Sequence, residues 1–224
     1  MAPIRHCAPL AYDYFRQQID RLDSTDGLLH AAIAISMHAL PNVVPSEVDN
    51  QLTQWAQTVR KRVSGPQPQA LLAHLHHLLF DELGFAGNTA SYYHPLNSYI
   101  PSVLESKTGI PITLTLVYKV VAERVGLRVQ GISAPGHFLA RVEAGDERAL
   151  VDPFHGGMML TAAEAQQKME KIFRRELPSD SDLFPVATHQ SWILRVLNNL
   201  RAIFAEEGRA NDVAALAELA ALLQ

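Results

Sequence analysis

His137 and Asp152 are the two residues whose types and spacing best fit catalytic chemistry. Each lies in a run of β-forming residues, and the polar, glycine-containing segment 143–147 separates the runs, as in a hairpin. A two-residue loop at 144–145 places the pair directly opposite each other, whereas a loop at 145–146, or a four-residue loop, makes them diagonal neighbours on one sheet face. A carboxylate there would orient the imidazole as a general base for acyl transfer. A structural hydrogen bond is the other use of such a pair.

Metal binding is an alternative for the same region. His94 and His155 could join His137 and Asp152, and two imidazoles with one carboxylate suit an open zinc or iron site. The spacing matches no established ligand motif, so the sequence predicts no metal site and no other cofactor.

An ordered series of short motifs surrounds the pair. The motifs are Phe85-Ala86-Gly87-Asn88, Tyr92 or Tyr93 with Pro95, Asn97-Ser98, Val103-Leu104, Gly109-Ile110-Pro111-Ile112-Thr113-Leu114, Pro135-Gly136-His137-Phe138-Leu139, and Asp152-Pro153-Phe154 with Gly157. This series resembles the bacterial SirB family of transglutaminase-like proteins. The resemblance implies an α+β fold with a transglutaminase/papain-like core, in which a buried helix packs against a small antiparallel sheet and a Cys, a His and an Asp converge.

The resemblance also shows what is missing. In active members of the superfamily, the cysteine begins the buried helix, where the helix dipole lowers a thiol pKa. The corresponding stretch here, 109–113, contains no cysteine, although His137 and Asp152 match the other two triad positions. Thr113 and Ser98 are the hydroxyls that could replace the thiol. Their structural alternatives are that Thr113 bonds a preceding carbonyl and that Ser98 caps a turn.

Three segments are expected to position these residues. Residues 1–83 form an N-terminal layer of about four helices, because apolar residues recur at helical spacing, and one helix starts near Pro45. Residues 84–188 form the core, in which an almost wholly apolar helix starts near Pro111 and ends at Gly126, followed by strands over 129–133, 137–142 and 148–151. Residues 189–224 form a helical hairpin broken at Gly208, resembling a truncated tetratricopeptide repeat.

The composition indicates a cytoplasmic protein. The 224 residues are 48% hydrophobic, but they include neither an apolar run long enough for a membrane helix nor a secretory signal. Cys7 is the single cysteine, which excludes an internal disulfide, and a free cysteine is more often a buried hydrophobe than a displaced nucleophile. A net charge of −4 without a basic stripe argues against nucleic-acid binding.

The leading functional hypothesis is a non-catalytic binding or scaffold module. Asn97, Ser98, Tyr93 and His155 are expected to line a shallow cleft with the His137 pair. A protein partner would bind at this cleft or on the C-terminal hairpin, whose apolar face a second copy could also cover. The alternative is a hydrolase or acyltransferase for amide-type substrates, using the His137/Asp152 pair with a hydroxyl or a metal-bound water.

Overall fold

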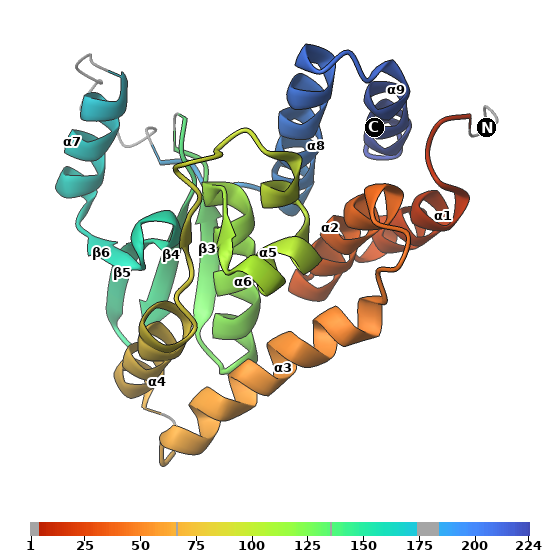
Figure 1. Ribbon diagram of the computed structural model, residues 1–224. Coiled ribbons are helices and arrows are strands. Elements are labelled where there is room, and N and C mark those ends of the chain that lie inside the picture. The colour runs from red at the N-terminus through yellow and green to blue at the C-terminus, as the bar shows by residue number, and fades with distance from the viewer. Residues whose placement is uncertain (1–4, 66, 135, 174–183) are drawn as a thin grey trace.

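The computed structural model describes residues 5–65, 67–134, 136–173 and 184–224, and helices make up most of it (Figure 1). The helices are α1 (Pro9–Gln18), α2 (Thr25–Ala39), α3 (Pro45–Arg62), α4 (Pro68–His76), α5 (Ile100–Ser106), α6 (Pro111–Arg124), α7 (Ala162–Phe173), α8 (His189–Glu206) and α9 (Ala210–Ala221). The strands are β3 (Arg128–Ile132), β4 (Leu139–Ala144), β5 (Glu147–Asp152) and β6 (Met158–Leu160), with a short parallel pair formed by β1 (Ala86–Gly87) and β2 (Thr108–Gly109).

Four α-helices, α1 to α4, lie in the segment for which the sequence predicts an N-terminal helical layer. Helix α3 begins at Pro45, where the missing N–H costs nothing because a first-turn N–H has no intrahelical partner. The short helix α5, the pair β1–β2, strand β6 and helix α7 were not predicted. Two of these follow the hairpin: β6 adds an edge strand to its sheet, and α7 packs Ala165 on a small cluster of sheet residues.

Helix α6 is the buried helix that the sequence predicts. It begins at Pro111, and it is followed by Gly126, whose φ of 97° is the left-handed conformation common after a helix end. Lys119 is its one buried cation, and its Nζ lies 2.5 Å from Oε1 of Glu123 and donates to the Val129 carbonyl at 2.6 Å. The charge is therefore compensated inside the core.

The sheet is antiparallel in the order β3-β4-β5-β6. Ala144 pairs with Glu147, so the hairpin loop is the two-residue Gly145-Asp146 form, and Gly145 has the positive φ of 68° that such tight loops use. Continued by one step, this register sets Asp152 opposite Leu139, two residues after His137. His137 and Asp152 are therefore diagonal neighbours, as one of the predicted arrangements requires. His137 itself precedes β4, so the predicted strand start at 137 is two residues early.

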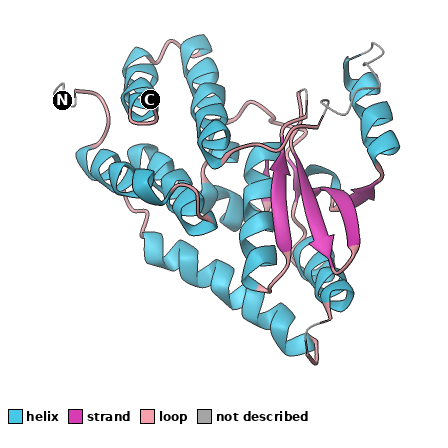
Figure 2. Ribbon diagram, turned by 180° about the vertical axis from the view of Figure 1, so that it is seen from behind, coloured by secondary structure: helices cyan, strands magenta, loops and turns pink. Residues whose placement is uncertain are grey.

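The two faces of the sheet carry cores of different size. Residues such as Val142 and Val151 join the main core with α6. On the opposite face, Leu139 and Leu150 belong to a small cluster closed by Ala165 of α7, and α7 stands beyond the β6 edge of the sheet (Figure 2). Asp152 belongs to this more lightly covered face.

The C-terminal hairpin α8–α9 shares the main core. Trp192 of α8 is fully buried against Gly131, where an added Cβ would lie 2.1 Å from the indole, and its Nε1 donates to the Ile112 carbonyl at 3.3 Å. On α9, Glu218 accepts backbone N–H groups of residues 5–7, so the two ends of the described chain meet (Figure 1). Across the described ranges, no helix combines the length and the apolar character that a bilayer crossing needs.

Candidate functional site

The structure joins His137 to Asp152. Nε2 of His137 lies 2.9 Å from Oδ2 of Asp152, and both side chains are buried. The diagonal register supplies this contact, because His137 enters β4 from the loop while Asp152 ends β5. Nδ1 of His137 makes no hydrogen bond to any described residue.

Asp152 is the centre of a larger network. Its Oδ2 also accepts from Nδ1 of His155 at 2.9 Å and from Nζ of Lys168 at 2.7 Å, and its Oδ1 accepts the backbone N–H of His155 at 3.3 Å. Burial by itself would raise the pKa of Asp152, but the hydrogen bond and charge of His137, followed by Lys168 and His155, hold that pKa well below its usual range. Because an ionised carboxylate only accepts, both imidazoles donate to it.

Two residues that the sequence did not single out support this network. Lys168 comes from α7, and Arg195 comes from α8. The guanidinium of Arg195 donates to the His137 carbonyl at 3.0 Å and to Oγ of Ser133 at 2.9 Å, and it lies over the Phe138 ring. Both residues reach the site only because their helices fold back onto the sheet, and no spacing signal in the sequence reports that.

The start of α6 holds no nucleophile bonded to His137. The hydroxyl of Thr113 donates toward the carbonyls of Asn97 at 2.6 Å and Ile110 at 3.1 Å, which is the structural role expected as its alternative. Within the described residues, no thiol or hydroxyl is hydrogen-bonded to His137. Thr113 is therefore not placed as an activated nucleophile.

Asn97 and Ser98 are both buried beside this helix start. The Asn97 amide donates to the carbonyls of Ser91 and Tyr92 at 2.7 and 3.0 Å and accepts from Asn88 at 2.9 Å, so it holds the preceding loop in shape. The Ser98 hydroxyl has no hydrogen-bond partner among the described residues, so the expectation that it caps a turn is wrong. Neither side chain faces solvent.

Tyr93 lies in a separate place. Its side chain is 74% exposed and lines a groove of about 680 Å³ between the loop at 90–96 and the turn joining α8 to α9, where Arg209 contributes. His137, Asp152 and Asn97 do not line this groove. The single cleft expected from the sequence is therefore divided into a buried network and an exposed aromatic groove.

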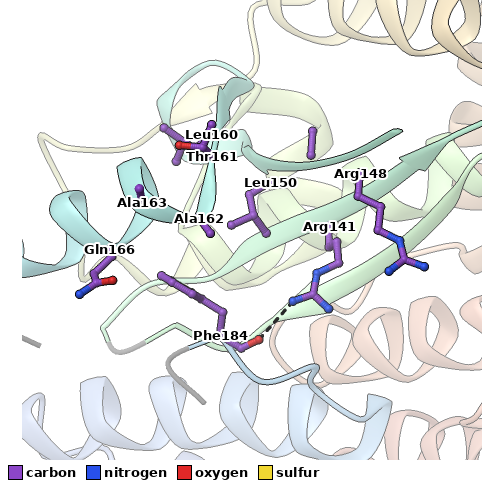
Figure 3. A pocket seen from close by; sticks show the side chains of 10 residues that line it. Arg141, Arg148, Leu150, Leu160, Thr161, Ala162, Ala163, Gln166 and Phe184 are labelled. Carbon is purple, nitrogen blue, oxygen red and sulfur yellow. Dashed lines mark hydrogen bonds between the residues drawn. The ribbon is translucent and has the colours of Figure 1, made fainter. Parts of the chain in front are cut away.

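A further cavity of about 590 Å³ opens on the outer sheet face (Figure 3). Arg141 and Phe184 lie on one side of it, and the Arg141 guanidinium donates to the Phe184 carbonyl at 3.5 Å. Leu150 and Gln166 also line it, and they precede Asp152 and Lys168 by two positions on β5 and α7. The cavity is thus a neighbour of the His137 network rather than part of it.

Cys7 is excluded as a displaced nucleophile. Its side chain is buried, and burial together with the negative charge of Glu218 raises its pKa to about 12, so the thiol stays protonated. Its backbone N–H bonds Glu218 of α9, which places it at the opposite end of the fold from the sheet hairpin.

His137, Asp152 and His155 are the group of side chains with metal-ligating geometry in the described part of the chain. Their ligand atoms all lie within 4.8 Å of one another. His94, the other candidate from the sequence, is not in this group, and its Nδ1 accepts the backbone N–H of Leu96.

Comparison with known proteins places the chain in a family. A family model described as the transglutaminase-like superfamily matches residues 46–198. A UPF0162 protein of Xylella fastidiosa is 32% identical over 200 residues, covering 88% of this chain and 71% of that protein. A UPF0162 protein of Pseudomonas aeruginosa is 30% identical over 139 residues, covering 60% and 49% respectively.

A eukaryotic relative shares the same region. F-box only protein 21 of Mus musculus is 32% identical over 150 residues, which are 63% of this chain and 23% of that protein. No solved structure gives a significant match. On the family model and the relatives from Xylella, the chain belongs to the transglutaminase-like superfamily and groups with its UPF0162 proteins.

Proposed function

We propose that the protein is a non-catalytic, transglutaminase-like binding module of the cytoplasm, related to the SirB-type proteins that its motifs resemble. The observation that carries the proposal is the hydrogen bonding of His137. Its Nε2 is hydrogen-bonded to Asp152, and its Nδ1 has no thiol or hydroxyl partner among the described residues. A general base without a nucleophile does not perform acyl transfer by the covalent route.

Recognition is assigned to the groove that Tyr93 lines. Tyr93 and Leu96 are exposed there although both are large and apolar, and exposed aromatic side chains provide contact area at low entropic cost. The groove joins the loop at 90–96 to the α8–α9 turn, so a protein partner would touch both the motif region and the C-terminal hairpin. Asn97 then acts indirectly, by holding the loop.

The binding proposal is tested with immobilised protein and a cell extract. Wild-type protein should retain one or more partners that the Tyr93→Ala variant loses. Leu10→Ala is the matched control, because Leu10 is 79% exposed and does not line the groove. Equal retention by the wild type and by Tyr93→Ala would reject the groove as the recognition surface.

Amide hydrolysis is the second candidate, and the orientation of His137 favours it. The proton on Nε2 points at Asp152, so in the neutral ring Nδ1 is a base that could activate a water. Peptide and glutamine-type amides are the substrates to assay. Hydrolysis that His137→Ala abolishes, with an unchanged circular dichroism spectrum, would replace the binding proposal with catalysis.

A further inference from the structure

The most concentrated set of ligating atoms in the described chain surrounds Asp152. Oδ2 of Asp152 lies 2.9 Å from Nε2 of His137 and 2.9 Å from Nδ1 of His155. In a tetrahedral zinc site with bonds of about 2.0–2.2 Å, neighbouring ligand atoms lie about 3.3–3.5 Å apart. All three ligand atoms lie within 4.8 Å of one another, so a rearrangement of the two imidazoles about the Asp152 carboxylate would bring the three spacings into this range.

The ligand types match a known class of ion. Two imidazole nitrogens and one carboxylate form the three-ligand set of open zinc sites and of non-haem iron sites, and they leave further positions for water or a ligand. Two of the three side chains are buried, whereas the side chain of His155 is 40% exposed, so the site has a route to solvent.

The backbone holds all three ligands in place. Arg195 fixes the carbonyl of His137, and Asp152 ends a paired strand. The turn that carries His155 is tied back to Oδ1 of Asp152 by its own N–H, and Gly156 continues that turn with a φ of 64°. A metal would therefore meet a largely formed site, which lowers the cost of ordering its ligands.

The ammonium of Lys168 would compete with a metal ion for the Asp152 carboxylate. Its ammonium lies 2.7 Å from Oδ2 and supplies the positive charge that the buried carboxylate needs when no metal is bound. The side chain is long, comes from the amphipathic helix α7 and is 19% exposed, so it can withdraw to water.

We propose that His137, Asp152 and His155 form a binding site for one divalent transition-metal ion of the zinc class, and that the metal displaces the ammonium of Lys168. Nε2 of His137 and Nδ1 of His155 become ligands when each neutral ring moves its proton to its other nitrogen, so neither ring loses a proton overall. Lys168 keeps its protons and moves into water. The proposal concerns metal binding and goes beyond recognition at the Tyr93 groove.

The test measures Zn²⁺ binding to the full chain by calorimetry, with Co²⁺ as a spectroscopic probe of coordination. The wild type should bind one equivalent of Zn²⁺, and His155→Ala should weaken binding about tenfold or more. Lys168→Met should tighten binding by about tenfold, because removal of the competing charge leaves the carboxylate free for the dication. Lys168→Gln serves the same purpose if the Met variant does not fold.

His77→Ala is the control for adventitious surface binding, because His77 is exposed beside Asp81 and Glu82. Its loss should leave the single equivalent unchanged. The proposal is overturned if neither the wild type nor Lys168→Met binds one equivalent, if His155→Ala binds as the wild type does, or if loss of the Lys168 charge leaves the affinity unchanged. Tetrahedral Co²⁺ absorption that is present in the wild type and absent in His155→Ala would support it.

Discussion

Asp152→Asn should destabilise the protein by about 2 kcal/mol, because the Asp152 carboxylate accepts hydrogen bonds from three separate side chains. The size of this loss of stability depends on how exposed each hydrogen-bond donor is. The Lys168 and His155 side chains are 19% and 40% exposed and can return to water, whereas the His137 side chain is only 5% exposed. The variant therefore loses the free energy of one buried, charge-assisted hydrogen bond. This is less than the about 3–5 kcal/mol expected when a buried ion is left without its partner.

Urea unfolding at pH 7 measures the change, with Asp49→Asn as the matched control. Asp49 also binds a cation, Arg124 at 2.5 Å, but its side chain is one-third exposed, so its loss should cost less than about 1 kcal/mol. The reasoning about burial is refuted if the two variants are equally stable.

The pH dependence gives a second check on the same variant. The pKa of Asp152 in the folded protein lies below its ordinary value of about 3.9, so its contribution is complete above that pH and is lost as the pH falls toward the folded value. The stability difference between the wild type and Asp152→Asn should therefore shrink below about pH 4. A difference that grows in acid would contradict the assigned sign.

Three further predictions concern other parts of the fold. Trp192→Ala should cost about 3–5 kcal/mol in urea unfolding, because it empties a fully buried site shared by α8, α6 and β3, while Asn198→Ala on the exposed side of α8 should change stability by less than about 0.5 kcal/mol. Burial lowers the pKa of His76 to about 4, so as the pH falls from about 6.5 toward 4 the wild type should lose up to about 3 kcal/mol more than His76→Gln does. With a pKa of about 12, only about one Cys7 thiol in ten thousand is ionised at pH 8, so iodoacetamide should label native protein far more slowly than protein unfolded in urea. Equal labelling in both states would show that the site opens.

Local features of the fold were readable from the sequence because they depend on neighbouring residues. The apolar run after Pro111 specifies a buried helix, and the glycine-containing segment before Glu147 specifies a hairpin, since helix and turn preferences act over a few residues. Strand β6 and helix α7 were missed: β6 is three residues long, and α7 buries only one side on a small cluster. A three-residue strand is too short to show a period, whereas α7 is amphipathic, so its apolar spacing was a readable signal that was overlooked.

The sequence by itself predicted that His137 and Asp152 lie close together, because each of the loop lengths considered puts positions 137 and 152 on the same side of the two chain segments. It also determined that no cysteine begins the buried helix. Only the tertiary structure decided that Lys168 and Arg195 complete the network and that Tyr93 lies in a different groove. Those contacts join elements far apart in the chain, and their positions follow from how α7 and α8 pack on the sheet, which no local pattern specifies.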